Sequence, residues 1–547
     1  MKAVFNLCFW FTFFTFSFIA NAQQKSENEI PHLKTQGTAT QLIVNGKPLL
    51  MLAGELGNSS ASNVEYMRPV WANLVKMNLN TVLVPAYWEL IEPMEGKYDF
   101  SLIDSLILNA RKNNLHIVFL WFGVWKNSMS CYAPLWVKEN YKRFTRAVNK
   151  EGKAMEILSP FGDENLKADI KVFSMLLKHI REFDSLSQTV VMVQVENEIG
   201  MLPDAREYSN AANVMYNSQV PPELLSYFKK HRESLTPEIV KAWGTNGFKT
   251  SGSWEEIFGK SDTTEEIFMA WNYGRFIEQL TLAAKREYPL PMYVNAALIR
   301  PNYKPGQYPS AGPLPHLFNV WRAAAPDIDF FAPDIYFPDF TNWSDKYKRP
   351  DNPLFVPETG GSVHNAITSL YAFGKHDAMG YSPFSIESIG DPENDPLTKC
   401  YEMLNQLSPI ILEKQGLGQM SGVVLDSIKQ VVTLTMGNYT LNIKHQYNWL
   451  TAPRDVDPVK SRAGCIIIQI TRDEYLVAGK GVVMNFTSAV RDDSIVGIGY
   501  IDEVKIENGK MISKLRLNGD QDHQGRHLWL PLDNKFHIQH IMLYRYK

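Results

Sequence analysis

Eight short apolar segments recur along the first three quarters of the chain, separated by stretches with helical spacing. Their apolar residues run continuously rather than in alternation, which is typical of strands buried on both faces of a parallel sheet. We expect these strands in segments 49–56, 80–88, 116–125, 189–198, 292–298, 328–336, 353–361 and 378–388. Between them, Leu, Ile, Trp and Phe recur every three or four residues, which predicts helices that include 64–78, 101–114 and 267–288.

The alternation of strands and helices over residues 41–410 predicts a (β/α)8 TIM barrel of the α/β class. Its longest insertion spans about 200–262, where segment 219–240 has the pattern of one or two extra helices. A doubly wound open sheet is the competing fold, but no Gly-x-Gly-x-x-Gly sequence follows the first strand. After about residue 410 short alternating runs are parted by Gly, Asn and Asp, so we predict a C-terminal antiparallel β-sandwich domain over 415–547.

The first 22 residues have the pattern of an export signal. A basic residue and an apolar run precede the small-x-small sequence Ala20-Asn21-Ala22. The run is short for a bilayer span and contains polar residues, so we expect cleavage rather than an uncleaved anchor. We therefore predict a signal peptide at 1–22, a linker at 23–40, and a periplasmic or secreted protein with no membrane contact after cleavage.

Composition limits the partners and cofactors. A formal charge of −3 argues against nucleic acid or an anionic membrane surface as partner. After signal cleavage only Cys131, Cys400 and Cys465 remain, which allows at most one internal disulfide. The chain has no Cys-x-x-Cys, His-Glu-x-x-His or clustered His spacing, so we expect neither a catalytic metal nor another cofactor. The sequence carries no signal for a particular oligomeric state.

In barrels of this type the functional residues lie where strands end, at the C-terminal face. The last residues of the eight segments are mainly carboxylates, amides and aromatics. Aromatic rings can cover the apolar faces of a pyranose while amides and acids bind its hydroxyls, so this set indicates a carbohydrate substrate. The strand-end residues are Glu55, Tyr87, Trp88, Glu89, Trp121, Trp125, Lys126, Asn127, Glu196, Asn197, Glu198, Asn295, Asp334, Tyr336, Glu358, Phe384, Ser385 and Glu387.

Two of these glutamates, Glu198 and Glu358, are candidates for a glycosidase pair. They end the fourth and seventh strands, which face each other across a barrel mouth, and a retaining glycosidase needs two carboxyls about 5–5.5 Å apart. An exposed glutamate is ordinarily a solvated loop residue, but both follow strongly apolar strands and precede loop sequences. Glu196 shares a strand face with Glu198 by period-two alternation, so strand geometry alone leaves both as candidates for the acid.

With Asn197 directly before Glu198, the sequence resembles the retaining glycoside hydrolases of clan A, in which an Asn-Glu pair ends strand four. This resemblance implies that Glu198 is the acid/base and that Glu358, in "PLFVPETGG", is the nucleophile. It also implies that Asn197 binds the substrate's 2-hydroxyl and that Tyr336 is the hydrogen-bond partner of the nucleophile. Glu196 is then expected to support the site.

Within the clan the chain is most similar to the β-galactosidases of families 35 and 42. "LLMLAGELGNSS" resembles the end of their first strand, and "VLVPAYWELIEPMEGKYDF" resembles their strand-two signature. "WFGVWKNSMSCYAPLWVK", "YPLPMYVNAAL" and "LNGDQDHQGRHLWLP" look like the bacterial branch of family 35 that carries its own C-terminal β-domain. The resemblance implies a retaining, exo-acting β-galactosidase of plant-type oligo- or polysaccharides, for example xyloglucan side chains.

Two departures from family 35 bear on the identity of the sugar. The family sequences Gly-Glu-x-His-Tyr and Cys-Ala-Glu are replaced here by Gly57-Asn58 and by Trp125-Lys126-Asn127. Two alternatives therefore stay open. One is another retaining glycosidase of clan A, such as a β-glucosidase, β-mannanase or α-arabinosidase, and the other is a non-catalytic carbohydrate-binding protein.

The remaining candidate substrate-binding residues are Glu55, Trp88, Glu89, Trp125, Asn127 and Phe384. Each carboxylate could instead form an ion pair, and each aromatic ring could instead pack in the core. We favour Trp125 as a sugar platform because the polar residues 126–128 mark where its strand leaves the core. Glu387 is a rival nucleophile on the last strand, and Glu92 beside Pro93 is expected to anchor a loop.

Overall fold

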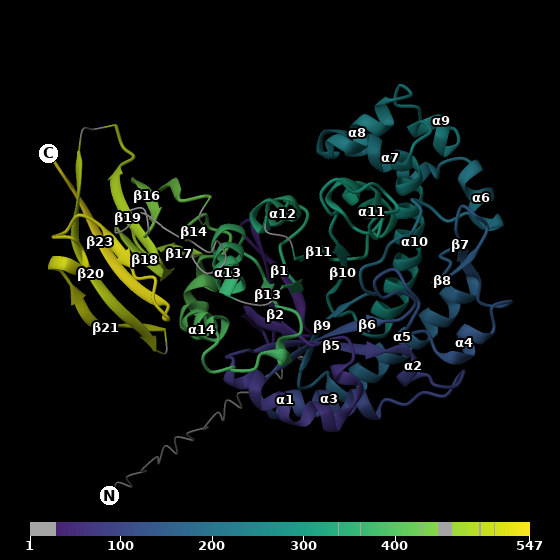
Figure 1. Ribbon diagram of the computed structural model, residues 1–547, viewed down its shortest axis with the longest axis horizontal. Coiled ribbons are helices and arrows are strands. Elements are labelled where there is room, and N and C mark those ends of the chain that lie inside the picture. The colour runs from purple at the N-terminus through teal and green to yellow at the C-terminus, as the bar shows by residue number, and fades with distance from the viewer. Residues whose placement is uncertain are drawn as a thin grey trace, which may run out of the picture.

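The computed structural model describes residues 29–336, 339–360, 363–426, 428–446, 462–491, 494–507 and 509–547. The predicted signal peptide at 1–22 lies outside these residues. The described chain forms a barrel and a C-terminal β-domain that lie side by side (Figure 1). No helix in these ranges combines the length and the apolar character that a membrane span requires.

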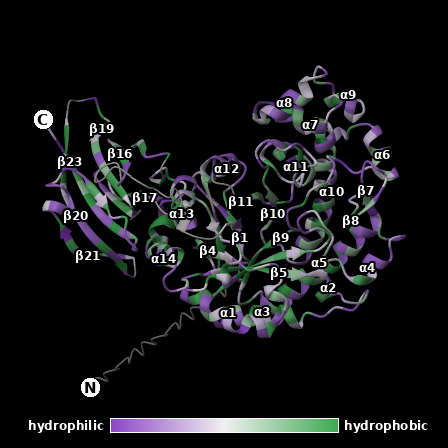
Figure 2. Ribbon diagram, viewed as in Figure 1, coloured by the Kyte–Doolittle hydropathy of each residue, from purple (hydrophilic) through white to green (hydrophobic). Residues whose placement is uncertain are grey.

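All eight predicted segments contain a strand, and the eight strands form one parallel barrel, which confirms the TIM-barrel prediction. The sheet closes where Val356 pairs with Tyr381. Figure 2 shows these strands as largely hydrophobic and the surrounding helices as mixed, as expected for a buried parallel sheet. In order along the chain the barrel strands are β4 (Met51–Glu55), β5 (Thr81–Tyr87), β6 (His116–Phe122), β9 (Val190–Gln194), β10 (Met292–Ala297), β11 (Phe330–Ile335), β12 (Glu358–Thr359) and β13 (Gly380–Tyr381).

Helices follow the strands and cover the outside of the barrel (Figure 1). The three predicted helices are present as α1, α3 and α10, although α10 begins before the predicted 267. Ser261 caps it by accepting a hydrogen bond from the Thr264 amide, a start signal that apolar spacing does not contain. The barrel helices are α1 (Val64–Lys76), α2 (Trp88–Ile91), α3 (Ser101–Lys112), α4 (Leu135–Glu139), α5 (Asp163–Asp184), α10 (Asp262–Glu287), α11 (Phe318–Ala324), α12 (Phe340–Tyr347), α13 (Val363–His376) and α14 (Pro396–Lys414).

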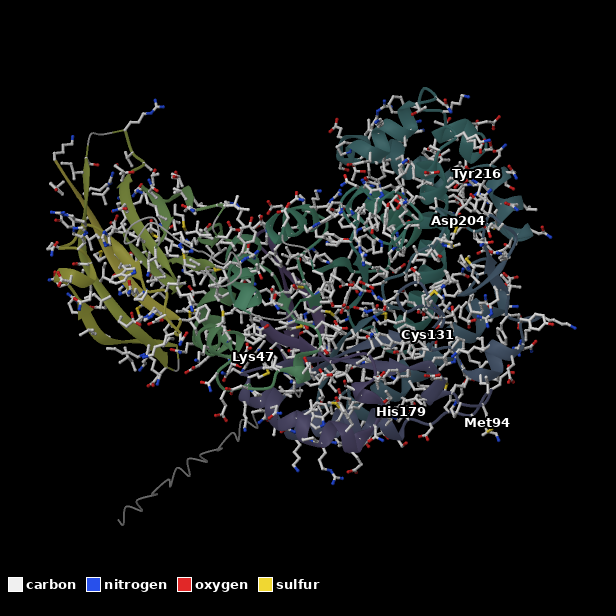
Figure 3. All side chains as sticks on the ribbon, in the orientation of Figure 1. Lys47, Met94, Cys131, His179, Asp204 and Tyr216 are labelled. Carbon is white, nitrogen blue, oxygen red and sulfur yellow. The ribbon has the colours of Figure 1, made fainter. Side chains whose placement is uncertain are left out.

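The insertion after β9 contains more helix than the sequence predicted. One or two helices were expected in 219–240; two are present, the second of which continues to Gly244, and two more flank them. The Arg206 guanidinium lies 3.8 and 4.3 Å from the centroids of the Tyr208 and Tyr216 rings. These contacts link two segments of the insertion. Tyr216 and Asp204 mark this region in Figure 3. Its helices are α6 (Asn210–Asn217), α7 (Pro222–Lys230), α8 (Pro237–Gly244) and α9 (Trp254–Phe258).

A β-hairpin that the sequence did not predict follows β6. It pairs β7 (Arg146–Val148) with β8 (Ala154–Leu158). Cys131, labelled in Figure 3, is exposed in the loop before this hairpin, whereas Cys400 and Cys465 are buried. All three thiols are free.

The C-terminal domain is an antiparallel β-sandwich, which confirms the predicted fold class. A six-stranded and a four-stranded sheet enclose a core of their own, in which Leu441, Ile467 and Ile541 are buried. Barrel helix α14 ends at Lys414, four residues beyond the expected limit of 410. The strands are β14 (Met420–Leu425), β15 (Val431–Met436), β16 (Tyr439–His445), β17 (Ala463–Gln469), β18 (Glu474–Lys480), β19 (Val482–Ser488), β20 (Ile495–Glu507), β21 (Lys510–Leu517), β22 (Leu528–Leu530) and β23 (His537–Tyr546).

The β-domain packs against the barrel through the outer face of the six-stranded sheet. Ile466, Leu476 and Val504 on that face belong to the core cluster of the barrel rather than to that of the sandwich. Helices α13 and α14 lie between the barrel strands and this sheet (Figure 1). Burial of this apolar face joins the two domains into one hydrophobic unit.

Part of the predicted linker at 23–40 is instead a folded sheet, so that prediction is wrong from residue 32 onwards. It consists of β1 (His32–Gln36), β2 (Ala39–Val44) and β3 (Lys47–Leu49). The Gln36 side chain donates to the Leu412 carbonyl at 2.9 Å, and the Thr38 amide donates to the Gly416 carbonyl at 3.1 Å. These bonds attach the sheet to the end of α14, a long-range pairing that local sequence patterns do not reveal.

We predict that alanine at Gly416 destabilises the protein more than alanine at Gly418. Both glycines have a left-handed φ, +75° and +68°, so either substitution costs roughly 1–2 kcal/mol of strain. A Cβ at Gly416 would lie 1.8 Å from the Gln36 carbonyl oxygen, whereas one at Gly418 would meet no atom within 4 Å. Thermal unfolding should therefore show the larger loss for G416A, and equal losses would contradict this packing.

Candidate active site

Strand β9 ends at Gln194, and residues 195–198 leave the barrel in an irregular turn. Glu196 and Glu198 both have positive φ, 59° and 45°, a region that side chains other than glycine rarely adopt and that clusters at functional sites. The expected period-two alternation of these glutamates is therefore wrong, because neither is part of the strand. The Glu198 amide donates to Asn295 Oδ1 at 2.9 Å, which holds the turn against β10.

Glu196 is fully buried and supports the neighbouring loop, as expected. Its two carboxylate oxygens accept hydrogen bonds from the Val124 amide at 3.0 Å and the Trp125 amide at 2.6 Å. Burial and the nearby Asp169 carboxyl raise the pKa of Glu196 well above its usual value. The Glu196 side chain therefore fixes the backbone that follows β6. Of the two glutamates that were candidates for the acid, only Glu198 faces the site.

Three carboxylates, each at or shortly after the end of a different barrel strand, meet at the C-terminal end of the barrel. Glu198, Asp334 and Glu358 each offer an oxygen within 4.8 Å of the other two. All three are at most 6% exposed. The Asn295 side chain joins them, because its Nδ2 donates to Asp334 Oδ2 at 2.7 Å while its Oδ1 accepts from the Glu198 amide. Asp334 and Asn295 were noted at strand ends but not assigned to the site.

Glu358 carries one engaged and one free oxygen. The Tyr336 hydroxyl donates to Glu358 Oε1, the contact that the resemblance implied. Glu358 Oε2 is buried and has no hydrogen-bond partner among the described residues. Tyr336 itself is 47% exposed, so it lies at the open side of the cluster. The free oxygen has the lone pairs that a nucleophile requires.

The proximity of the carboxylates changes their proton affinities. Burial, with the Glu198 carboxyl as the next cause, raises the pKa of Glu358 to about 7, while Lys126 and the Tyr336 hydroxyl lower it. Burial and the Glu358 charge raise the pKa of Asp334 well above its usual value. Burial and, next, the Glu358 charge also raise the pKa of Glu55. The cluster therefore favours protonation of some of its members at neutral pH.

Lys126 is the cation within this acidic site, and its role was not predicted. It is 5% exposed, and its ammonium donates to Asn197 Oδ1 at 2.8 Å and lies 5.2 Å from the centroid of the Phe122 ring. Asn197 Nδ2 is buried without a hydrogen-bond partner among the described residues, so it remains available as a donor. The adjacent Asn127 donates through Nδ2 to the Glu198 carboxylate. In the sequence, Lys126 and Asn127 are the polar residues that follow the apolar run of the third strand.

The tryptophans proposed as sugar platforms lie in the core, so those two predictions are wrong. Trp88 and Trp125 are both fully buried. The Trp88 indole donates to Glu92 Oε2 at 3.0 Å and packs edge-on against Trp136. The Trp125 indole donates to the Leu158 carbonyl at 3.1 Å. Residues that follow β6 contact both rings: Trp136 of α4 packs on Trp88, and Leu158 of the β7–β8 hairpin accepts the hydrogen bond from Trp125.

Three acidic candidates have structural partners. Glu89 lies 3.9 Å from Lys138 in a half-exposed ion pair, which favours the structural alternative. Glu92 accepts a hydrogen bond from the Gly96 amide at 2.7 Å, which confirms it as a loop anchor. Glu387 accepts from the Gly57 amide at 2.9 Å, so this rival nucleophile instead holds the loop after β4.

Glu55 and Phe384 lie beside each other at the barrel mouth. Their backbones form a parallel bridge, and the Phe384 amide donates to the Thr359 carbonyl at 2.9 Å. Glu55 Oε1 is buried and has no hydrogen-bond partner in the described chain. Phe384 is half-buried. Both residues therefore remain candidates for contact with a substrate.

Oxygen ligands of this kind could also hold a divalent cation. Among the described residues the Glu198, Asp334 and Glu358 carboxylates are the group with suitable spacing. The buried ammonium of Lys126 already supplies a positive charge beside them. The cluster can therefore balance its charge with protons and this lysine.

A TIM barrel with a pair of glutamates at the C-terminal ends of strands four and seven defines the protein as a glycoside hydrolase. The model of glycoside hydrolase family 42, described as beta-galactosidase, matches residues 61–358, and the chain belongs to this family. The expected membership of clan A is supported, while the narrower assignment to family 35 is not established by this match. A domain of unknown function (DUF5597) matches residues 397–529, which comprise α14 and most of the sandwich.

Individual relatives match parts of the chain. Beta-galactosidase 13 of Arabidopsis thaliana is 26% identical over 171 residues, which cover 29% of this chain and 18% of the relative. The match to beta-galactosidase 11 of the same plant has 25% identity and the same extent, so the chain spans less than a fifth of these curated relatives.

Solved structures with a similar fold include two bacterial beta-galactosidases. The enzyme from Bacillus circulans sp. alkalophilus has a TM-score of 0.45 and 15% identity, covering 66% of this chain and 57% of its own. The enzyme from Rahnella sp. R3 has a TM-score of 0.47 and 14% identity, covering 69% and 58%. Membership of the family follows from the family model and not from these distant similarities.

We predict that Lys126→Met shifts the acid limb of the pH profile of kcat/KM towards higher pH. The ammonium lowers the pKa of Glu358, so its loss leaves that carboxyl protonated up to a higher pH. The profile is measured with a nitrophenyl β-galactoside. Lys138→Met is the control, because Lys138 pairs with Glu89 outside the cluster. An unchanged acid limb in K126M would show that this charge does not control the activity through Glu358.

Proposed function

We propose that the protein is a retaining, exo-acting β-galactosidase that works by double displacement. The observation that carries the proposal is the approach of the Glu198 and Glu358 carboxylates to within 4.8 Å, in a chain of the beta-galactosidase family. An inverting enzyme would need its carboxyls about 6.5–9.5 Å apart to leave room for a water. The short separation therefore favours a covalent intermediate.

In the first step Glu358 Oε2 attacks the anomeric carbon, and the bond from that carbon to the leaving oxygen breaks. Glu198 gives its proton to the leaving oxygen, so the aglycone departs as an alcohol. The Tyr336 hydroxyl, bonded to Oε1, orients the nucleophile and leaves Oε2 free. In the second step Glu198 takes a proton from water, which attacks the same carbon and releases Glu358.

The surrounding side chains have complementary tasks in this proposal. The unused Nδ2 of Asn197 can donate to the 2-hydroxyl of the sugar, a contact that strengthens in the transition state. The free oxygen of Glu55 can accept a bond from another hydroxyl. Phe384 offers a half-buried ring to the apolar face of the pyranose. Asn127 orients the Glu198 carboxyl.

We infer a plant-type galactosylated glycan, such as xyloglucan side chains, as the substrate class. This inference about the substrate, and the resemblance to family 35, both depend on sequence motifs such as "WFGVWKNSMSCYAPLWVK". The departures at Asn58 and Lys126 affect the positions where family 35 enzymes contact galactose. Another clan A glycosidase therefore remains the second candidate.

We predict that Glu358→Gln abolishes turnover of nitrophenyl β-galactoside, because an amide cannot form the ester intermediate. Glu198→Gln should reduce turnover of a substrate with a poor leaving group by roughly 10²–10⁴-fold, the usual contribution of acid catalysis. The loss should be smaller with dinitrophenolate, which leaves without a proton. Glu387→Gln is the matched control and should keep its activity. Turnover retained by E358Q would show that the nucleophile is wrong.

The sugar is tested by product analysis on galactosylated xyloglucan, lactose, β-1,4-galactan and a panel of nitrophenyl glycosides. We predict release of galactose as the β-anomer, as a retaining enzyme requires, and no loss of rate with a metal chelator. Glucose, mannose or arabinose released without galactose would favour the second candidate and contradict the β-galactosidase proposal.

We also propose that the protein is exported. The pattern at residues 1–22 supports this proposal, and the mature chain should then begin at Gln23. N-terminal sequencing of protein recovered from the periplasm or the medium tests it. Recovery only from the cytoplasm, with the chain beginning at Met1, would contradict it.

A further inference from the structure

A cavity of about 760 Å³ lies apart from the carboxylate cluster. Its walls come from α8 and α9 of the insertion, the start of α10, the loop after β10, and α12. Glu198, Asp334 and Glu358 do not line it. Figure 1 shows α8 at the top of the molecule with the rest of the insertion, and α12 lower, near α13. A volume of this size can enclose more than one sugar residue.

The cavity and the catalytic cluster share two barrel strands. Strand β10 carries Asn295, which binds the Glu198 amide, and four residues later Ile299 lines the cavity. An extended chain spans at most about 3.4 Å per residue, so at most roughly 14 Å separates these two residues. Strand β11 leads through Tyr336, beside Glu358, into α12, where Trp343 lines the cavity.

One wall of the cavity is also attached to the catalytic turn. Met201, three residues after Glu198, exchanges backbone hydrogen bonds of 2.8 and 3.2 Å with Ser310. Ser310 lies in the same loop as Tyr308, which lines the cavity. A ligand held in the cavity would therefore be positioned relative to the acid/base of the proposed reaction.

A buried polar network forms part of this lining. Glu266 is 2% exposed and accepts a hydrogen bond from the Tyr308 hydroxyl at 2.7 Å. His316 Nε2 lies 2.9 Å from the other Glu266 oxygen. Both oxygens of the Glu266 carboxylate are thus engaged by Tyr308 and His316. Glu266 therefore holds the cavity wall together and is not available to bind a ligand.

The remaining charged groups of the lining are mostly cationic. Three basic side chains line the cavity, together with the Glu238 carboxylate. Arg349 pairs with Asp351 at 3.2 Å, whereas Lys241 and Lys346 form no ion pair within the described chain. The Lys346 ammonium lies 4.8 Å from the centroid of the half-buried Trp343 ring. An aromatic ring beside a free ammonium suits a sugar that carries a carboxylate.

We propose that this cavity binds a uronic acid residue in the part of the substrate that remains after galactose is removed. The proposal rests on the proposed function and narrows it: among plant-type galactosylated glycans, those that carry uronic acids are preferred over neutral ones such as xyloglucan. Trp343 stacks on the apolar face of the sugar, and Lys241 and Lys346 pair with its carboxylate. The loop between β10 and α11 links this site to the turn that carries Glu198.

The test compares a galactosylated oligosaccharide that contains a uronic acid with the same compound after reduction of the carboxyl to an alcohol. The double variant Lys241→Met, Lys346→Met should raise KM for the acidic compound by roughly tenfold, the scale of one charged hydrogen bond. KM for the reduced compound and kcat/KM for nitrophenyl β-galactoside should not change. Lys230→Met is the matched control, because Lys230 is exposed on α7 of the insertion and does not line the cavity.

Trp343→Ala should raise KM for both oligosaccharides and leave the nitrophenyl substrate unaffected. Trp343 is partly buried, so its substitution could impair folding. In that case the double variant of the exposed Lys241 and Lys346 still tests the proposal. An equal KM for the acidic and reduced compounds in the wild type, with normal turnover of the nitrophenyl substrate, would overturn the cavity proposal alone.

Calorimetric binding of the acidic oligosaccharide to the E358Q protein separates the two proposals, because it requires no turnover. Binding that weakens on the lysine substitutions would support the cavity site even if no β-galactoside is hydrolysed. Binding that is absent, or that the lysine substitutions do not change, would overturn it.

Discussion

The burial of Glu198, Asp334 and Glu358 within one small volume is the constraint on which the rest of the site depends. Like charges at such separations repel strongly where water is scarce, so the three cannot all be ionised without compensation. The compensation comes from the buried ammonium of Lys126, from the Tyr336 hydroxyl and from retained protons. Glu358 can then be ionised near neutral pH while Asp334 and Glu55, whose pKa values are raised by burial and by the Glu358 charge, retain protons.

The scaffold around these groups is built to keep them in place. Glu196 uses both carboxylate oxygens to bind the backbone after β6, and that backbone carries Lys126 and Asn127 into the site. Asn295 ties the Glu198 turn to Asp334 on the next strand but one. The positive φ values of Glu196 and Glu198 are thus maintained by buried hydrogen bonds on both sides of the turn. Strain of this kind persists only where the surroundings determine the conformation.

Much of this arrangement was predictable from the sequence, because strand identity in a parallel barrel follows from continuous apolar runs. All eight strands lie where those runs are, and the strand-end rule brought together Glu198, Glu358, Tyr336 and Asn197. The same rule failed for Trp88 and Trp125. It takes no account of the segment after β6, in which Trp136 of α4 packs on Trp88 and Leu158 of the β7–β8 hairpin bonds to Trp125. Composition alone cannot distinguish a rim tryptophan from a covered one.

Other features were beyond local patterns because they depend on contacts between distant segments. The attachment of β1 and β2 to the end of α14 involves residues more than 370 positions apart. Lys126 was named only as a strand-end residue and as a departure from a family sequence, and its position beside Asn197 follows from the left-handed turn rather than from strand alternation. The cavity between α8 and α12 required the insertion to fold back over the barrel.

The central claim is that Glu358 is the residue that becomes covalently attached to the sugar. Treatment with a 2-deoxy-2-fluoro-β-galactoside that carries a good leaving group should trap this intermediate, since the fluorine slows its hydrolysis. Proteolysis and mass spectrometry should then locate the added fluorogalactosyl mass on the peptide that contains Glu358. A label on Glu387 or Glu55, or no label in a protein that still hydrolyses the parent galactoside, would contradict the account.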